Sequence, residues 1–461
     1  MLFSSHVFLF AFLPVVLFLY YISPRKLRNP VLLAVSLFFY GWGEPVYLFL
    51  MVFTIVINYL CGAWVAVLRK QGKQPRAAVF TAVTVNMLLL AYFKYAGFLL
   101  DSIRSLIPGM SDLAIPEILL PIGISFYIFQ SLSYVIDVYR GDAPVQKNLL
   151  TFGTYVTLFP QLIAGPIVRY RDVALQMDQR KENLSDFSSG VLLFIAGLSK
   201  KVLLANPMGS LWNLAQDEKG TVLAWVGIIA YAMQIYFDFS GYSDMARGLG
   251  RMLGFEFLEN FNYPYISRSI TEFWRRWHIS LSTWFREYVY IPLGGNRRGI
   301  SRQILNLLVV WMLTGLWHGA SWNFVLWGLY YAVFLILEKL FLLKALERVP
   351  NPLRVCYTML AVLLGWVLFY FEDMTALGCF LERLFTLESI SVSGKNIISA
   401  YLPLLAAACV ACTPMVRNAV LALEEKSWVR WGRMLASGAA LLLCVSALAS
   451  QSYNPFIYFR F

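Results

Sequence analysis

The sequence predicts an all-α protein that crosses a membrane many times. Hydrophobic residues make up 59% of the 461 residues and charged residues only 14%, whereas soluble domains carry about 25% charged residues. Apolar stretches recur along almost the whole chain, and several reach the length of about 20 residues that a helix needs to cross the bilayer core. Because backbone groups in hydrocarbon must pair within their own segment, we expect helices, with about ten to twelve crossings, in one membrane domain over residues 1–461.

The candidate membrane segments follow one another with short polar loops between them. Some, such as 31–41, are too short to cross straight and are predicted to be bent or re-entrant. No basic residue precedes the first segment and further segments follow it, so we expect a membrane anchor and not a cleaved signal peptide. In chain order the segments are 4–23, 31–41, 47–68, 78–100, 117–138, 187–206, 221–240, 303–317, 322–343, 353–371, 398–412 and 434–450.

Basic residues in the loops predict the topology. The basic cluster at 25–28 follows the first segment, and the positive-inside rule places it in the cytoplasm and the N-terminus outside. Counting forward, the basic loop 69–76 falls inside, the loop 101–116 with its single arginine falls outside, and the basic residues at 140–147 fall inside again. We therefore expect a multi-pass protein of the plasma membrane, which is the inner membrane of a cell that has two.

The net charge of +12 does not indicate nucleic-acid binding. The basic residues flank membrane segments, where topology and anionic lipid account for them, and the chain has no phosphate-binding loop or zinc-finger spacing. Cys409 and Cys412 have CxxC spacing, but no second pair or nearby histidine completes a metal site. We expect no bound metal, and we interpret most of the six cysteines as small packing residues.

Two membrane segments carry features that interrupt a plain helix. Two prolines and a glycine fall within the apolar stretch 159–166, which predicts either a re-entrant hairpin lining a pocket or a kinked span. Gln130, Ser133, Asp137 and Arg140 share one face of the segment before it, where we expect a helix-packing network.

Asp238 is an acid at membrane depth. It shares a helical stripe with Gln234 and Tyr242 and follows a long apolar run, so it needs a partner or a water-filled cavity. Arg247 and the basic element 262–300 are the candidate partners. A buried structural pair and a functional role both fit this position.

Residues 262–300 break the hydrophobic rhythm and are interpreted as an interfacial element on the cytoplasmic side. Ser267 or Ser269 is a candidate N-cap, and Pro292 with the two glycines after it ends the pattern. The aromatic face predicts a helix lying at the membrane surface. Its members, at helical spacing, are Phe273, Trp277, Leu281, Trp284 and Tyr288.

His278 borders this aromatic face, one helical turn from Trp274 and from Leu281. A polar tip held against aromatic walls can line a portal for a charged substrate, with Arg275 or Arg276 attracting its anionic groups. A hydrogen-bonded structural histidine fits the pattern as well, and the residue alone does not decide between the two.

His318 is the candidate reactive residue. It follows the apolar run 304–316 in a chain with only three histidines, and hydrocarbon penalises ionisable groups that are not shielded or used. Imidazole moves protons near neutral pH, so a general base is one interpretation; a buried, hydrogen-bonded histidine is the other. Trp317 and Trp322 would limit water, and Thr314, one turn earlier, could orient the ring.

Seven segments together resemble the membrane-bound O-acyltransferase superfamily, in particular the bacterial branch typified by the membrane subunit of alginate O-acetylation. The resemblance covers nearly the whole chain, with 350–450 the least diagnostic part. The matching segments are Leu120–Phe126, Phe159–Pro166, Asp238–Asp244, Phe273–Ser282, Ile291–Gly295, Leu316–Gly319 and Asn454–Phe459.

The resemblance implies a ring of helices around a tunnel, and transfer of an acyl group, usually acetyl, from a cytoplasmic donor to an extracytoplasmic hydroxyl. His318 matches the family's catalytic histidine and His278 the second histidine, at the cytoplasmic portal. Glu287 stands where this branch is expected to have aspartate, which leaves its role open. The candidate donor-tunnel residues are Arg275, Arg276, Trp274, Trp277, Asp238, Thr314, Trp317 and Asn323.

The leading hypothesis is an O-acetyltransferase for an exported or cell-wall polysaccharide, with no bound cofactor. The donor would be acetyl-CoA or a carrier-protein thioester, and a separate extracytoplasmic transferase would complete the reaction, because no large domain for gripping a polymer is evident. D-alanyl transfer to teichoic acid, known from a related branch, is the second hypothesis. A transporter or scaffold for acyl groups is the third, although the chain lacks the repeats typical of transporters.

Overall fold

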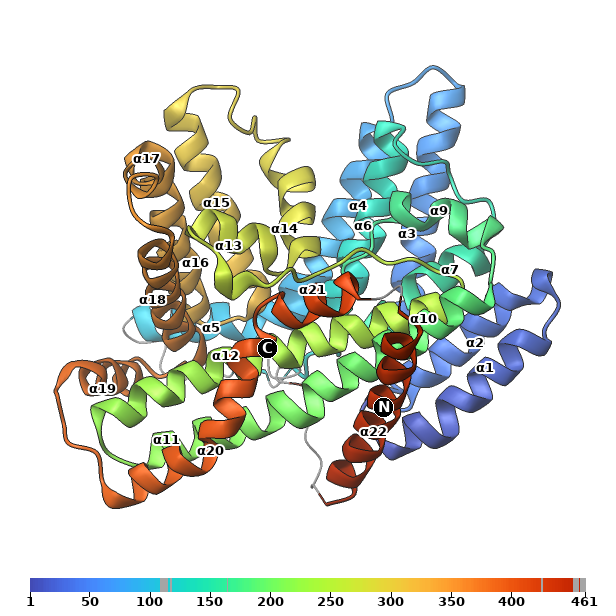
Figure 1. Ribbon diagram of the computed structural model, residues 1–461. Helices are drawn as coiled ribbons and strands as arrows, with labels where there is room; N and C mark the ends of the chain where they lie inside the picture. The colour runs from blue at the N-terminus through green and yellow to red at the C-terminus, as the bar shows by residue number, and fades with distance from the viewer. Residues whose placement is uncertain (108–114, 117, 164, 424–425, 451–455, 457–461) are drawn as a thin grey trace. The chain divides into compact units, whose positions relative to one another are not determined.

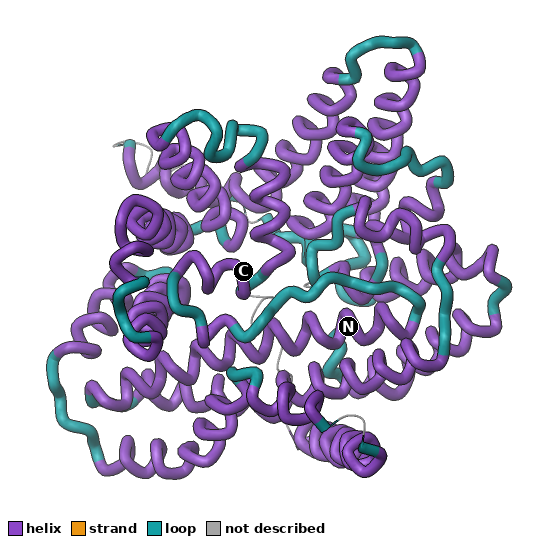
Figure 2. The backbone as a smooth tube through the Cα atoms, turned by 45° about the horizontal axis from the view of Figure 1, so that its top comes forward, coloured by secondary structure: helices purple, strands orange, loops and turns teal. Residues whose placement is uncertain are grey.

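The computed structural model describes all residues except 108–114, 117, 164, 424–425, 451–455 and 457–461. The described residues form helices joined by loops, with no strand among them (Figure 2). They make two compact units, one of Met1–Val191 with Ala246–Leu258 and one of Leu192–Met245 with Glu259–Phe461. The all-α prediction is confirmed, while one continuous membrane domain stays a prediction.

The first unit contains antiparallel helices packed on one another. In Figure 1, α3, α4 and α6 lie side by side. Gly62 of α3 faces Tyr134 of α6, and a Cβ at this glycine would overlap the tyrosine ring. The helices are α1 (Leu13–Ile22), α2 (Arg28–Gly41), α3 (Leu48–Lys70), α4 (Arg76–Leu90), α5 (Ala96–Leu106), α6 (Ile124–Arg140), α7 (Leu149–Thr157), α8 (Phe159–Leu162) and α9 (Tyr170–Gln179).

Two long helical runs contribute to both units: α10 (Leu184–Ser199), extended by the π-helical turn η4 (Lys200–Ala205), and α12 (Thr221–Met252). The second unit also holds an aromatic core and several short helices. The remaining helices are α11 (Asn206–Asp217), α13 (Ile270–Arg276), α14 (Ile279–Phe285), α15 (Ile300–His318), α16 (Trp322–Leu337), α17 (Leu343–Leu346), α18 (Asn351–Tyr370), α19 (Met374–Phe385), α20 (Val392–Ala411), α21 (Met415–Ala422) and α22 (Ser427–Ser450).

Nine helical runs within the described residues are long and apolar enough to cross a membrane, and the helix Phe8–Ile22 is apolar but shorter. The number of crossings, expected at about ten to twelve, stays a prediction. The nine runs are Leu48–Lys70, Arg76–Leu106, Leu184–Asp217, Thr221–Met252, Ile300–His318, Trp322–Leu346, Asn351–Tyr370, Val392–Ala411 and Ser427–Ala449.

The helix break predicted at 159–166 is confirmed. Helix α7 ends at Thr157, and the four-residue helix α8 begins at Phe159. The backbone amide of Phe159 is satisfied by the hydroxyl of Ser36 on α2, at 3.1 Å. Ala164 lies outside the described residues, as does the terminal motif 454–459 apart from Phe456.

The prediction of one continuous surface helix in the element 262–300 is wrong. The structure forms two short helices, α13 and α14, followed by the π-helical turn η6 (Arg286–Tyr290). The aromatic residues that periodicity assigned to a headgroup face are buried: Phe273 is 0% exposed, Trp277 3% and Trp284 5%. Helix α13 instead packs on α16 and α18, so its aromatic side chains belong to the protein core.

Glycines bring α15 and α16 into backbone contact. A Cβ on Gly315 of α15 would overlap the carbonyl oxygen of Phe324, and a Cβ on Gly328 of α16 would overlap the carbonyl oxygen of Trp311. Small residues allow this close crossing in membrane helices. The crossing fixes the C-terminal end of α15, and with it His318, against α16.

Candidate active site

His278 sits at the break between α13 and α14. Trp277 is extended (φ −102°, ψ 130°), and His278 takes a left-handed conformation (φ 44°, ψ 55°) as the N-cap of α14. Such a conformation costs a non-glycine residue about 1–3 kcal/mol and is found mostly where the surrounding structure imposes it. The helical position that periodicity gave His278 is therefore wrong, and its side chain is aimed by tertiary contacts.

The segment around Asn260 imposes this conformation. The amide of Ile279 donates to the carbonyl of Asn260 at 3.0 Å, and the amide of Asn262 donates to the carbonyl of Arg276 at 2.9 Å. The side-chain oxygen Oδ1 of Asn260 accepts from the amide of Ser280 at 3.1 Å and from its hydroxyl at 2.9 Å. These bonds replace the helical ones that α13 and α14 would otherwise share.

Asn260 also sets the protonation state of His278. Nδ1 of His278 lies 3.3 Å from Oδ1 of Asn260, and this oxygen is an acceptor because it takes the Ser280 amide. Nδ1 therefore carries a proton, which leaves Nε2 with its lone pair. Burial lowers the pKa of His278 to about 3, so the ring is neutral at neutral pH. Within the described residues Nε2 has no hydrogen-bond partner.

A cavity of about 270 Å³ opens beside His278. Its walls come from α13, α14, η6, α15 and α16, and are mostly apolar. Three of the residues predicted for the donor tunnel line it, Trp274, Arg275 and Thr314, together with His278. The hydroxyl of Thr314 donates to the carbonyl of Val310 at 2.8 Å, so its one proton is not available to His318.

Arg276 and Trp277 do not line this cavity. Arg276 pairs with Glu272 at 2.9 Å and donates to the carbonyl of Asn262 at 3.1 Å. The ring of Trp277 packs on the ring of Trp366, with centroids 4.9 Å apart. Arg275 is thus the member of the arginine pair that faces the cavity, and Arg276 holds the element together.

His318 is the last residue of α15 and is 6% exposed. Aromatic rings surround its imidazole, with centroids of Trp317 and Trp327 at 5.1 Å and of Phe369 at 5.3 Å. The expected wall at Trp322 stays a prediction, and that side chain is 54% exposed. Trp327, a little over one turn further along α16, is a wall that the sequence did not mark.

The ring of Trp317 touches both histidines. Its centroid lies 5.8 Å from that of His278 and 5.1 Å from that of His318. The two imidazoles are thus joined by one indole that is 3% exposed. Asn323 supports this arrangement, since its amide donates to the carbonyl of Phe369 at 3.2 Å and fastens α16 to the end of α18.

Asp238 is paired away from the cavity. Its carboxylate lies 2.5 Å from the ammonium of Lys201 on η4, and the two side chains are 2% and 4% exposed. Lys201 is a partner that the sequence did not mark, and pairing of Asp238 with Arg247 or the 262–300 element stays a prediction. A second bridge, Lys200 to Asp244 at 2.6 Å, joins the same two elements. This supports a structural role for Asp238.

Sequence reasoning missed Asn260, Trp327 and Phe369. Each acts through a contact with a residue distant in the chain, and none stands in a pattern that marks it. Across the described residues, no group of three or more histidine, cysteine, aspartate or glutamate side chains could hold a metal ion.

The long apolar helices identify a polytopic membrane protein, and its two buried histidines mark the candidate active site. Comparison with known proteins agrees with this description. The profile of the membrane-bound O-acyltransferase family matches residues 36–371. The chain belongs to this family and is an acyltransferase of the membrane.

The relatives place the chain in a branch of that family. It is 41% identical to the probable alginate O-acetylase AlgI of Pseudomonas putida over the whole of both chains. It is 32% identical to the peptidoglycan O-acetyltransferase of Helicobacter pylori, covering 85% of this chain and 81% of that one. A teichoic acid D-alanyltransferase of Bacillus subtilis is more distant, 30% identical over 48% of this chain and 59% of its own. The alginate O-acetylase branch is thus confirmed.

Proposed function

We propose that this chain transfers an acetyl group from a thioester on the cytoplasmic side of the membrane to a hydroxyl of an exported or cell-wall polysaccharide. The observation that carries the proposal is the contact of Trp317 with both His278, beside the cavity, and His318, in its aromatic enclosure. The names of two relatives, an alginate O-acetylase and a peptidoglycan O-acetyltransferase, support acetyl transfer to a polysaccharide over D-alanyl transfer.

In this proposal His318 is the general base. Its imidazole takes the proton of the acceptor hydroxyl as that oxygen attacks the thioester carbonyl carbon. The new C–O bond forms, the C–S bond breaks, and the proton passes from the imidazolium to the departing thiolate. The rings of Trp317, Trp327 and Phe369 exclude water, which would otherwise hydrolyse the thioester.

His278 serves donor access in this proposal. Its neutral ring presents Nε2 as an acceptor beside a mostly apolar cavity, which suits an uncharged arm with amide N–H groups. His278→Ala is therefore expected to raise the donor KM more than it lowers kcat. If kcat collapsed while donor binding was unchanged, His278 would have a chemical role instead.

The experiment for the function supplies membrane vesicles with radiolabelled acetyl thioester and measures label in isolated polysaccharide. We expect incorporation that requires this chain together with an extracytoplasmic transferase partner. No label in alginate, peptidoglycan or another exported polymer, with label instead in lipid or released as acetate, would contradict the proposed acceptor class.

The direction of transfer depends on topology. We propose that the N-terminus lies outside and that the element 262–300 faces the cytoplasm, because its arginines flank membrane helices. A single cysteine placed at Asn296, an exposed position, should resist impermeant thiol reagents in intact cells and react after permeabilisation. Ready labelling in intact cells would reverse the topology and the proposed direction.

A further inference from the structure

A cavity of about 500 Å³ lies within the first unit, which holds neither His278 nor His318. Its walls come from α9, the start of α10, the last turn of α12 and the loops that follow α9 and α12. Both signs of charge line it: the cations are Arg180, Lys181 and Arg251, and the carboxylates are Asp186 and Glu256. We call it the mixed-charge cavity.

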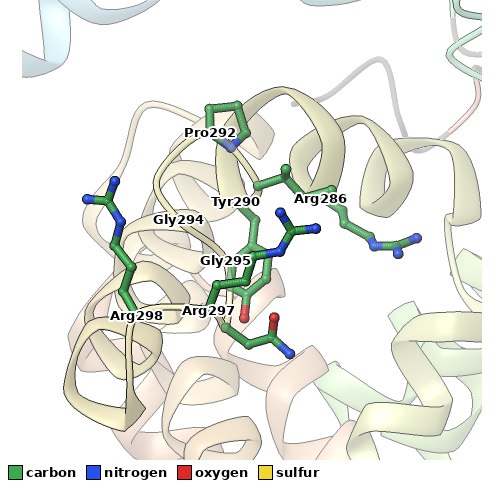
Figure 3. Close-up of a pocket in the computed structure, with 9 residues that line it drawn as sticks. Arg286, Tyr290, Pro292, Gly294, Gly295, Arg297 and Arg298 are labelled. Carbon is green, nitrogen blue, oxygen red and sulfur yellow. The ribbon is translucent and has the colours of Figure 1, made fainter.

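This mixture of charges distinguishes the cavity from the one over the loop after η6. That cavity, of about 470 Å³, is lined by Arg286, Arg297 and Arg298 and by no carboxylate among the described residues (Figure 3). A cleft lined by charges of one sign attracts ions of the opposite sign in general. Cations and carboxylates in one cavity instead match a ligand that carries both charges.

Arg180 is a fixed part of the mixed-charge cavity, since its side chain is only 6% exposed. Its Nε donates to the hydroxyl of Tyr20 at 2.8 Å, and its Nη1 donates to Oδ1 of Asn29 at 2.6 Å. The guanidinium group lies over the ring of Phe255, 4.6 Å from the centroid. Within the described residues, its other terminal nitrogen, Nη2, makes no hydrogen bond. Because Arg180 lines the cavity, the N–H groups of Nη2 are available to a ligand there.

The ion network around Arg180 has an excess of positive charge. Glu182 accepts from the hydroxyl of Tyr20 at 2.5 Å and pairs with Arg28 at 2.6 Å. The same carboxylate lies 3.7 Å from Nε of Arg180, so one carboxylate faces two largely buried guanidinium groups. Buried charges are stabilised when they are paired. An anionic group of a ligand at Arg180 would supply the missing counter-charge.

The cavity lies at the ends of two helical runs that are long and apolar enough to cross a membrane. One run begins at Leu184, and the other ends at Met252, so Asp186 and Arg251 lie in their end turns. Leu175 of α9 and Leu184 of α10 are 76% and 83% exposed. Polar groups at the ends of membrane helices lie at the level of the lipid headgroups, and exposed leucines beside them suit acyl chains.

We propose that the mixed-charge cavity binds the headgroup of a zwitterionic phospholipid that has a primary ammonium, of the phosphatidylethanolamine type. The phosphate lies against Arg180 and Arg251, because guanidinium N–H groups pair with phosphate oxygens. The ammonium lies against Glu256, since its three N–H donors suit a carboxylate. The side chain of Glu256 is 80% exposed and 3.9 Å from that of Arg251, a gap wider than a hydrogen bond. The proposal does not depend on acetyl transfer.

The test is native mass spectrometry of the full-length chain in uncharged detergent. The chain is titrated with phosphatidylethanolamine, phosphatidylcholine and phosphatidylglycerol that have the same acyl chains. Phosphatidylethanolamine should bind about tenfold more tightly than phosphatidylcholine, whose quaternary ammonium has no N–H to donate, and more tightly than phosphatidylglycerol, which has no ammonium. Soluble phosphoethanolamine should compete only weakly, because it has no acyl chains to bury.

Two variants separate the two halves of the headgroup. Arg251→Gln should weaken phosphatidylethanolamine binding about tenfold, the usual worth of a hydrogen bond to a charged group. Glu256→Gln should weaken phosphatidylethanolamine but not phosphatidylglycerol, so the preference between the two lipids is lost. Both side chains are partly or largely exposed, so unfolding without added lipid should match the wild type. The matched controls Arg348→Gln and Glu347→Gln, exposed positions in the second unit, should bind all three lipids like the wild type.

Equal affinity of the wild type for the three lipids, or an unchanged lipid preference in Glu256→Gln, would overturn the proposal. Tighter binding of phosphatidylglycerol than of phosphatidylethanolamine would make the cavity a site for anionic lipid and contradict the proposal. Phosphoethanolamine or inorganic phosphate that bound as tightly as the lipid would make it a site for a soluble phosphate, which would also contradict the proposal.

Discussion

Removing the side chain of Asn260 tests how the fold aims His278. Asn260 is 1% exposed, and its Oδ1 takes the Ser280 amide, the Ser280 hydroxyl and His278 Nδ1. Asn260→Ala leaves these buried donors without their acceptor. A buried unsatisfied donor costs about 1–3 kcal/mol, and the Ser280 hydroxyl can rotate to another acceptor. The remaining two donors predict a loss of about 2–6 kcal/mol in the free energy of unfolding.

The assay is denaturant unfolding of the purified chain in neutral detergent, with Ser280→Ala as the matched control. That control removes the hydroxyl but keeps the buried amide bond, so we expect a loss of about 1 kcal/mol or less. Asn260→Ala should also raise the donor KM as His278→Ala does, and the double variant should add little to either. Wild-type stability together with wild-type KM in Asn260→Ala would refute the idea that this side chain positions His278.

Three further predictions concern a close helix crossing, a buried ion pair and the titration of His278. Gly315→Ala should abolish monodisperse protein because its Cβ overlaps the Phe324 backbone, whereas Gly378→Ala, with nothing within 4 Å of the added Cβ, should express like the wild type. Lys201→Ala should cost about 3–5 kcal/mol in the free energy of unfolding, because it removes the ammonium that pairs with the buried Asp238 carboxylate, and the double variant Lys201→Met with Asp238→Leu should cost much less. Equal losses would contradict the pairing. The pKa of His278 is lowered to about 3, so its contribution to the stability of the folded protein is complete above pH about 6.5. That contribution is lost progressively as the pH falls toward 3. Between these pH values, the stability of His278→Gln should therefore depend less on pH than that of the wild type.

Much of the fold could be predicted from the sequence, because the constraints that a membrane places on helices act on short, local stretches of sequence. Apolar length predicted the helices, and the prolines and glycine of 159–166 predicted an interrupted helix in that stretch, since both effects act within a few residues. The position of His318 within an apolar run was also a local signal, and its burial against aromatic rings agrees with it.

The errors fall where distant contacts override local patterns. Helical spacing of aromatics ran unbroken through His278, but hydrogen bonds from Asn260 and Asn262 break the helix there. Asp238 pairs with Lys201, which lies on another helical run and far from it in the chain, so no local pattern marked this partner. The contact of Trp327 with His318 depends on how α16 packs on α15, which no local pattern in the sequence reveals.

The central claim is that His318 performs proton transfer in acyl transfer. The most direct measurement compares acetyl incorporation into polysaccharide by the wild type, His318→Gln and His6→Gln, the last being an exposed histidine outside the site. Glutamine keeps a polar, hydrogen-bonding side chain but cannot accept the proton. We predict normal expression and monodispersity for both variants, unchanged incorporation for His6→Gln, and a fall of about 10²–10⁴-fold for His318→Gln. Near-wild-type incorporation by His318→Gln would contradict the account and make His318 a structural residue.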